Sequence, residues 1–349
     1  MGGMFMTIGE KIQKQRKDLG ISQEELAQKL LVSRQTISQW EKGQTVPTID
    51  NLLRLKDVFG ISADEILNGD EKPETKLNTN SLDTICAALT YAMGVEPPKQ
   101  AAPANYELTN YIDKMFGGKK ADRVFMYNPD AVAQWIMEKY PEFLKEVTEK
   151  TELRVPLRSV MPSVTPVCFG TMYTGAQPEV HGIQAYEKPV ITIDTIFDAL
   201  IRAGKKPVIV VCGQASLGKI YLNRDMDYVV IENGKQGNVA PANAAVAQMI
   251  MEDKYDFYVV YNGNYDAVMH RCGPEDPRTL AELRINSHVF SWFSHMIEKH
   301  WKHHRTLIGF AMDHGCHEID GGCGSHGLDM PEDLNIVHMY KAIKGENAE

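Results

Sequence analysis

Long apolar runs are missing from this sequence of 349 residues. Its first twenty or so residues contain no apolar run behind a basic start. No later stretch approaches the ~20 apolar residues that a membrane-spanning helix needs. These absences exclude an export signal and a membrane span, so we expect a cytoplasmic protein without a membrane partner.

Cysteine is also scarce, with six residues in the whole chain. So few thiols in so long a chain do not predict a disulfide framework, and cytoplasmic thiols stay reduced. Cys316 and Cys323 stand seven apart and lack the Cys-x-x-Cys spacing of a zinc finger. We therefore expect the cysteines to occupy packing positions.

An excess of positive charge is the third absence, because the formal net charge is −9. Residues 1–70 carry nine Lys/Arg and ten Asp/Glu, which leaves −8 for the rest of the chain. Bulk attraction to nucleic acid is therefore excluded. Any DNA binding must come from locally placed cations such as Lys11, Lys14, Arg16 and Lys17.

Residues 1–70 show apolar residues at three- and four-residue spacing with polar punctuation, which predicts an all-α domain of five short helices. Polar residues suited to cap or open a helix precede four of them: Ser22 with Glu25, Ser33, Pro47 with Thr48, and Ser62 with Glu65. A tight turn at Leu31–Val32 joins two helices of about nine residues at a steep angle. That arrangement predicts a helix-turn-helix, whose second helix can enter a major groove.

The segment SQEELAQKLLVSRQTISQWEKG resembles the phage-repressor-like (XRE-type) helix-turn-helix family along its whole length. The resemblance implies double-stranded DNA as a partner and a homodimer that binds two half-sites. Carried over by position, it puts Arg34, Gln35 and Gln39 on the bases. It puts Gln23 and Lys42 near the phosphates, and Ser33 is a further predicted DNA-binding residue. Arginine suits guanine edges and glutamine suits adenine edges.

Leu31 departs from the family, which often has glycine in this turn. A leucine in the left-handed conformation costs roughly 1 kcal/mol or more. The alternative for the whole domain is a helical module that binds another protein, in which Arg34 and Gln39 are merely solvated.

Residues 71–80 are rich in charge, Pro, Asn and Thr without an apolar period, and we interpret them as a linker. In residues 81–349, short apolar runs such as VFMY, KPVIVVC, DFYVVY and TLIGFAM alternate with helical stretches. This alternation predicts an α/β sandwich domain around a largely parallel central sheet.

Carboxylates and imidazoles follow these apolar runs closely. Asp130 comes after VFMY, Asp266 and His270 after DFYVVY, and Asp313 with His314 after TLIGFAM. The carboxyl ends of parallel strands meet at one edge of a sheet, so these side chains can share a site. Such ligands suit a divalent ion, with Zn²⁺ or Mn²⁺ preferred.

From about residue 122 to 340 the chain resembles the alkaline phosphatase superfamily, especially its type I phosphodiesterase and nucleotide pyrophosphatase branch. The motifs that carry the resemblance appear in order: Asp130, Thr165, Asp266-x-x-x-His270, Asp313-His314-Gly315 and His326-Gly327. Asn128 is a nearby competitor for the first position. Val167 and Cys168 stand where relatives commonly have Pro and Asn, and a sulfatase is unsupported by the residues after Thr165.

The resemblance implies two divalent ions. One would be held by Asp266, His270 and His326, and the other by Asp130, Asp313 and His314, with the Thr165 hydroxyl on the second ion as the nucleophile. It also implies a phospho-threonine that water then hydrolyses. Lys219 occupies a region where related phosphonate hydrolases place substrate-binding lysines, although a lone exposed lysine is the commoner explanation.

We therefore expect a two-metal phosphoryl-transfer hydrolase fused to a sequence-specific DNA-binding domain. The substrate is a small phosphorylated compound or a phosphonate. One alternative is a transcription regulator whose hydrolase-like domain senses a phosphorylated metabolite without turnover, and another is a domain that merely dimerises. The intact nucleophile position disfavours a sensor, and the six ordered ligands disfavour a mere dimerisation domain.

Overall fold

The computed structural model describes residues 7–61, 66, 76–213, 215–231, 239–319 and 322–346. The chain divides into two compact units, residues 1–76 and 77–349. Residues 77–80, which the sequence assigns to a linker, belong to the second unit. There the Asn78 side-chain amide donates to Gln134 at 2.8 Å and to the Leu157 carbonyl at 2.9 Å. Residues 71–75 of that linker lie outside the described residues.

Within its described residues the first unit has helices α1 (Ile8–Asp18), α2 (Gln23–Leu30), α3 (Arg34–Glu41) and α4 (Ile49–Phe59). The predicted caps of three helices are confirmed. Ser22 and Glu25 form a capping box, Ser33 accepts from Thr36 N–H, and Thr48 caps α4. The signal for a fifth helix, Ser62 with Glu65, lies outside the described residues.

The core of the first unit forms because each helix buries one apolar stripe. Leu26, Leu30, Ile37 and Leu55 are fully buried, and Trp40 is 4% exposed. Leu31, in contrast, is 80% exposed and ends α2 in the left-handed conformation, with φ 57°. The departure noted in the sequence is therefore a real backbone feature.

The second unit is built around strands β1 (Arg123–Pro129), β2 (Leu153–Arg158), β3 (Pro207–Cys212), β4 (Asp227–Ile231), β5 (Phe257–Asn262), β6 (Thr306–Phe310) and β9 (Asn335–Ile343). They form one sheet in the order β2-β9-β6-β1-β5-β3-β4. β9 runs antiparallel to both of its neighbours, so the other six strands share one direction. The predicted α/β fold with a largely parallel sheet is confirmed.

A separate small hairpin joins β7 (His317–Ile319) to β8 (Cys323–Ser325). The described helices of the second unit are α6 (Thr84–Met93), α7 (Tyr106–Phe116), α8 (Gln134–Lys139), η1 (Pro141–Leu144), α9 (Lys145–Lys150), α10 (Thr165–Thr174), α11 (Pro178–His181), α12 (Ile196–Arg202), α13 (Ser216–Ile220), α14 (Ala240–Glu252), α15 (Asn264–Cys272), α16 (Pro277–His300) and α17 (Pro331–Leu334).

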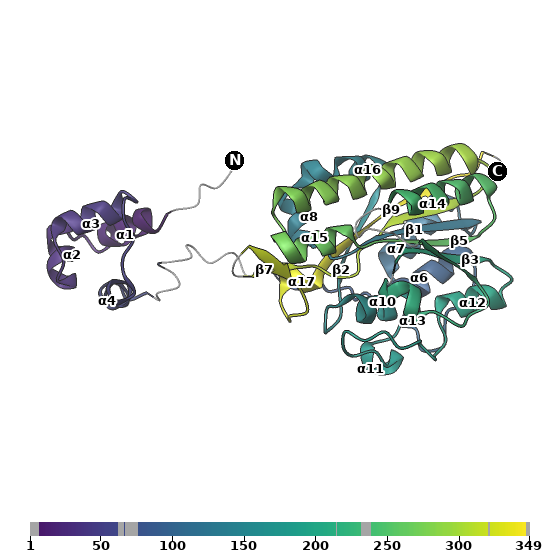
Figure 1. Cartoon of the computed structure of the whole chain (residues 1–349), viewed down its shortest axis with the longest axis horizontal. Helices are drawn as coiled ribbons and strands as arrows, with labels where there is room; N and C mark the ends of the chain where they lie inside the picture. The colour runs from purple at the N-terminus through teal and green to yellow at the C-terminus, as the bar shows by residue number, and fades with distance from the viewer. Residues whose placement is uncertain are drawn as a thin grey trace. The chain divides into compact units, whose positions relative to one another are not determined.

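Helices cover both faces of the sheet, with α14 and α16 on one side and α6, α10, α12 and α13 on the other (Figure 1). β1 contacts both layers through alternating side chains. Tyr127 donates to Asn286 of α16, whereas the next residue, Asn128, accepts from Tyr173 of α10. The strand is buried on both faces, as expected for the centre of such a sheet.

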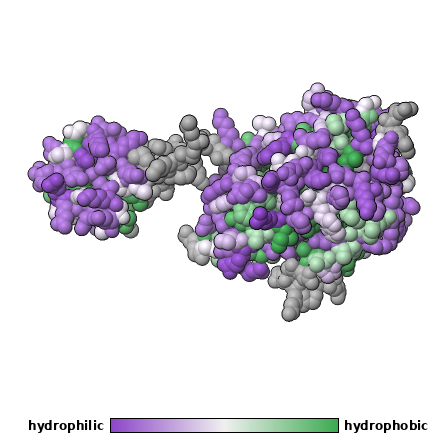
Figure 2. Space-filling model, turned by 90° about the horizontal axis from the view of Figure 1, so that it is seen from above, coloured by the Kyte–Doolittle hydropathy of each residue, from purple (hydrophilic) through white to green (hydrophobic). Residues whose placement is uncertain are grey.

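Figure 2 shows a mostly hydrophilic surface with a band of hydrophobic residues on the second unit. Among the described residues, no helix is both long and apolar enough to cross a membrane.

Candidate metal centre

The parallel strands bring two clusters of predicted ligands together beyond their carboxyl ends. The inner cluster consists of Asp130 after β1 and Asp313 with His314 after β6. These three side chains are at most 1% exposed. His314 Nε2 lies 3.4 Å from Asp130 Oδ1 and 3.4 Å from Asp313 Oδ2. Three polar ligands thus point at one buried position.

The outer cluster consists of Asp266 and His270 on α15 and of His326 after β8. Asp266 Oδ1 lies 3.2 Å from His270 Nε2 and 3.4 Å from His326 Nε2, and the two Nε2 atoms are 3.1 Å apart. The His270 side chain is 42% exposed. The outer cluster therefore faces solvent more than the inner one.

In all three imidazoles of the clusters, the ring nitrogen that faces away from the cluster is hydrogen-bonded to the main chain. Each Nδ1 lies within hydrogen-bond distance of a backbone carbonyl, so this nitrogen is the donor and Nε2 is directed into its cluster. The carbonyls belong to Gly324 for His270, Gly315 for His314 and Ser163 for His326, at 3.0, 2.9 and 2.9 Å. This is the orientation that a metal-binding imidazole needs.

Three carboxylate oxygens in the clusters are buried and accept no hydrogen bond within the described part of the chain: Asp130 Oδ1, Asp266 Oδ1 and Asp313 Oδ2. Burial raises the pKa of Asp130 well above its usual value, and the Asp313 carboxylate raises it further. Burial also raises the pKa of Asp313 to about 8. Such groups need a positive charge beside them if they are to stay ionised.

The spacing of the ligand atoms fits that need. In a tetrahedral shell with bonds of about 2.0–2.1 Å, neighbouring ligand atoms lie about 3.3 Å apart. The separations in the two clusters run from 3.1 to 3.4 Å. The donor set also suits a borderline divalent ion. Both clusters are therefore candidate sites for one such ion each.

In the outer cluster the Asp266 carboxylate, 3.2 Å from His270 Nε2, raises the pKa of His270 to about 9. A proton between the two Nε2 atoms would also relieve the repulsion of their lone pairs. A divalent ion therefore competes with a proton at the outer cluster.

Thr165 is the first residue of α10 and its side chain reaches the inner cluster. Its Oγ1 lies 3.4 Å from Asp130 Oδ2 and 3.4 Å from His314 Nε2. The residue is 4% exposed. The dipole of a helix favours negative charge at its amino end, where this hydroxyl stands.

Asn128, the competitor for the position of Asp130, has a structural place instead. Its amide donates to the Ala311 carbonyl at 2.6 Å and its Oδ1 accepts from Tyr173 at 2.8 Å. Both ends of the side chain are thus satisfied inside the core. Asp130 is the residue that joins the inner cluster.

Tyr261 contacts the inner cluster but is not predicted from the sequence. It stands near the end of β5, and its hydroxyl donates a short hydrogen bond to Asp130 Oδ2. Only the pairing of β5 with β1 brings the two together, so spacing along the chain gives no signal.

Lys219 lies half-buried on α13, after β3. Within the described residues no hydrogen bond or ion pair joins its side chain to either cluster. Cys316 is buried and Cys323 is partly buried, and neither is a ligand atom of the two clusters.

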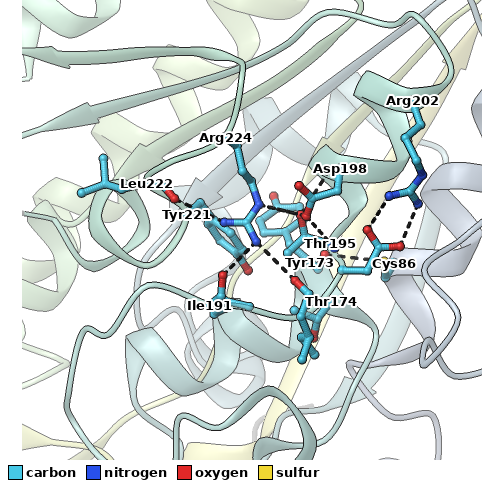
Figure 3. Close-up of polar contacts among 12 residues, drawn as sticks. Cys86, Tyr173, Thr174, Ile191, Thr195, Asp198, Arg202, Tyr221, Leu222 and Arg224 are labelled. Carbon is cyan, nitrogen blue, oxygen red and sulfur yellow. Dashed lines mark hydrogen bonds and ion pairs between the residues drawn. The ribbon is translucent and has the colours of Figure 1, made fainter.

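A polar cavity of about 520 Å³ is lined by residues 190–194, α12 and residues 222–224. Figure 3 shows Arg224 directed at this loop, where it donates to the Ile191 carbonyl at 3.0 Å and to Asp198 at 2.9 Å. Arg202 is likewise paired with Asp194, at 2.6 Å. The charges are satisfied internally, so we assign the arginines to loop stabilisation.

In the first unit, Arg34, Gln35 and Lys42 are exposed on or beside α3, and Gln39 is half-buried. Ser33 is exposed but caps α3 with its side chain. Four of the six residues predicted to contact DNA thus stand on the predicted recognition helix or just before it.

Arg16 and Gln23 have an internal role that the sequence does not predict. The Arg16 guanidinium donates to both oxygens of Glu41, at 2.6 and 3.1 Å, and the Gln23 amide donates to Glu41 at 2.8 Å. Burial opposes ionisation of Glu41, but these donors keep its pKa below the ordinary value. Arg16 is therefore committed to the core of the unit rather than placed for DNA.

The fold and the clusters define a small helix-turn-helix unit joined to an α/β unit with two candidate ion sites, and two family models match parts of these units. Residues 12–66 match the helix-turn-helix family and residues 127–189 match the type I phosphodiesterase / nucleotide pyrophosphatase family. The first unit is thus similar to the helix-turn-helix family, and the second unit contains a segment similar to the type I phosphodiesterase / nucleotide pyrophosphatase family. The second match contains Asp130 and Thr165, whereas the other ligands lie beyond it.

Curated relatives match the first unit. The transcriptional activator BcrR of Enterococcus faecalis is 39% identical and the regulator DicA of Escherichia coli is 46% identical, each over 66 residues or 19% of this chain. The matches cover 32% and 49% of those proteins, so the chain spans less than half the length of either.

Solved structures resemble each unit. The P22 c2 repressor bound to a synthetic operator is 42% identical, and the match covers 19% of this chain and 98% of that one, with a TM-score of 0.18. Human ectonucleotide pyrophosphatase / phosphodiesterase 5 is 17% identical over 57% of this chain and 58% of its own, with a TM-score of 0.47.

Proposed function

We propose that the second unit is a two-metal phosphoryl-transfer hydrolase in which Thr165 is the nucleophile. The observation that carries this proposal is the convergence of three buried carboxylate oxygens without hydrogen bonds and three oriented imidazoles beside one threonine hydroxyl. The substrate is a phosphate monoester, a phosphate diester or a phosphonate.

The outer cluster would hold one divalent ion and the inner cluster the other, with Zn²⁺ or Mn²⁺ preferred by the mixed oxygen and nitrogen ligands. Such ions neutralise non-bridging phosphoryl oxygens and stabilise the attacking and leaving oxygens of an in-line displacement.

The chain's own residues would then carry out the following steps. Thr165 Oγ1 forms a bond to phosphorus as the bond from phosphorus to the leaving group breaks. The hydroxyl proton passes to solvent water, and the leaving group takes up a proton from solvent. Asp130 Oδ2 and His314 Nε2, each 3.4 Å away, hold that hydroxyl in place. Water then hydrolyses the phospho-threonine, which restores the threonine and releases the phosphoryl group.

The second candidate is a regulator that senses a phosphorylated metabolite without turnover. A sensor needs the ions and a phosphate but has no need of a hydroxyl at Thr165. The closeness of this hydroxyl to the inner cluster therefore favours an enzyme.

The test combines metal analysis of the purified chain with hydrolysis of p-nitrophenyl phosphate and of its bis ester. Thr165→Ala should bind two ions as the wild type does but lose at least about a thousandfold in kcat. Thr174→Ala is the matched control, because the Thr174 hydroxyl bonds to the Gly170 carbonyl within the same helix. Unchanged turnover in Thr165→Ala would remove the proposed nucleophile, whereas ion binding without wild-type turnover would support the sensor.

For the first unit we propose sequence-specific binding to double-stranded DNA, with Arg34, Gln35 and Gln39 on the bases. Lys42 and Gln23 stay assigned to the phosphates and Ser33 stays a predicted DNA contact, although the structure also gives Ser33 and Gln23 internal bonds. A homodimer, a cytoplasmic location and a substrate contact by Lys219 stay predictions.

An operator selected from random DNA would test this second half. Arg34→Ala should weaken binding to that operator by ~1–3 kcal/mol and relax the preference at one base pair. Lys56→Ala, an exposed cation on α4, controls for the loss of one charge. Equal weakening by the two variants would contradict base recognition by Arg34, and no change in Arg34→Ala would point to a protein partner instead.

A further inference from the structure

The two carboxylate oxygens of Asp130 have different surroundings. Oδ2 accepts the hydrogen bond from the Tyr261 hydroxyl and lies 3.4 Å from the Thr165 hydroxyl. Oδ1 is buried, accepts no hydrogen bond from the described residues, and lies 3.4 Å from His314 Nε2. The phenol thus occupies one oxygen and leaves the other directed into the inner cluster.

The position of the Tyr261 hydroxyl is built by several parts of the fold. Tyr261 pairs in register with Asn128 on the neighbouring strand, two residues before Asp130. Its ring stands edge-on to Phe169, with ring centroids 5.8 Å apart. At Gly263 a Cβ atom would lie 2.6 Å from the hydroxyl oxygen, so only glycine leaves room for it.

The other ligands of the inner cluster are oriented differently. The Ala131 N–H donates to Asp313 at 3.3 Å, and the Gly315 carbonyl holds His314 at 2.9 Å. Both supports come from the main chain, which a side-chain substitution does not remove. Asp130 differs because a side chain supports it.

We infer that Tyr261 is a positioning residue for the inner ion, which it serves by fixing the rotation of the Asp130 carboxylate. The terminal torsion of an aspartate is broad, so an ungripped carboxylate turns easily. Hydrogen-bond partners behind metal ligands are worth ~10–100-fold in metal affinity. This inference rests on the proposed function, since it requires an ion at the inner cluster.

The experiment is a titration of the metal-stripped full chain with Zn²⁺ against a chromophoric chelator. Tyr261→Phe should weaken one of the two binding events about 10–100-fold and leave the other within about twofold. Tyr173→Phe is the matched control, because it removes a buried phenol that donates to Asn128 instead. That control should bind both ions as the wild type does.

A His270→Ala background identifies the affected ion. It removes an outer ligand, so the remaining event belongs to the inner cluster, and Tyr261→Phe must still weaken it. Gly263→Ala is a second variant that keeps the phenol but forces it to move, and it should give the same selective loss. It keeps the inference testable if Tyr261→Phe does not fold.

Wild-type affinity for both ions in Tyr261→Phe, or equal weakening of both events, overturns the positioning role and leaves the proposed function intact. A wild-type chain that binds no Zn²⁺ overturns the two-metal proposal and this role with it. The two failures are thus distinguishable in one experiment.

Discussion

The two units bury carboxylates in opposite ways. Glu41, whose side chain is 1% exposed, is balanced within the first unit by Arg16 and Gln23. Asp130 and Asp313 are equally buried in the second unit, and no lysine or arginine pairs with them among the described residues. An unbalanced buried charge costs several kcal/mol. The first unit therefore balances its buried carboxylate with its own side chains, whereas the second holds buried carboxylates that no lysine or arginine of the described residues balances.

The largest expected effect comes from removing the cation that balances the buried carboxylate of the first unit. Arg16→Met leaves Glu41 buried without its cation, which should lower the free energy of unfolding of the first unit by about 3–5 kcal/mol. Peptide-resolved hydrogen exchange measures each unit separately within the full chain. The double variant Arg16→Met/Glu41→Leu should recover most of the loss, and a single-variant loss below about 1 kcal/mol would show that the pair is not needed.

The second unit also buries an ionisable side chain in its neutral form, the imidazole of His181. Burial lowers the pKa of His181 to about 4, and the ring bonds to Thr171 and the Ile183 N–H. The unfolded chain takes up the proton near pH 6.5, so stability is complete above that value and is lost as the pH falls towards 4. The loss from this residue is at most about 3 kcal/mol.

Acid titration of unfolding by calorimetry measures that loss. His181→Gln should flatten the fall between pH 6.5 and 4, although it lowers stability at pH 8. His338, whose pKa burial also lowers to about 4, still contributes in the variant. An unchanged slope would mean that the buried His181 ring is already protonated in the folded chain.

Ion addition should sharpen the contrast directly. Zn²⁺ or Mn²⁺ at 100 times its dissociation constant should raise the free energy of unfolding of the second unit by about 2.7 kcal/mol per site. The first unit should not respond. Asp313→Asn should remove the inner-site increment, and hydrogen exchange of the two units in the same sample gives both values. Equal stabilisation of both units would indicate non-specific binding.

Helix ends extend the comparison to the backbone. Helix α4 of the first unit and helices α6, α7 and α10 of the second end at glycines in the left-handed conformation, whereas α2 ends so at Leu31 and α14 at Asp253. Leu31→Gly should raise the stability of the first unit by about 1 kcal/mol. Leu19→Gly is the control, because Leu19 ends α1 with φ −80° and gains nothing from glycine. Equal effects would exclude relief of strain at Leu31.

Two kinds of feature can be predicted from the sequence: helix caps, which depend on residues close together in the chain, and residues that directly follow parallel strands. The caps at Ser22, Ser33 and Thr48 depend on residues three positions away, and the structure confirms them. Asp130 and Asp313 lie at one sheet edge because the strands that precede them, β1 and β6, are parallel neighbours. No comparable rule predicts from the sequence which groups pair across helices or across strands.

Arg16 shows why such pairings escape prediction. Its partner Glu41 lies 25 residues away, so both charges look like solvated helix faces until the helices are packed. Tyr261 is similar, because an aromatic residue in a strand is ordinarily a core residue. The start of the second unit at Leu77 is not predicted either, because the side chain of Asn78 makes its hydrogen bonds to residues more than fifty positions away.

The backbone carbonyls behind the three imidazoles have a consequence for mutational searches. A screen that exchanges side chains will detect the ligands themselves and leave their supports untouched. Those supports can be disturbed only by moving the peptide, as at Gly315, where an added Cβ would lie 2.1 Å from the Glu332 carbonyl oxygen. The orientation of the three imidazoles is therefore set by the conformation of the loops behind them, and not by the side chains that those loops carry.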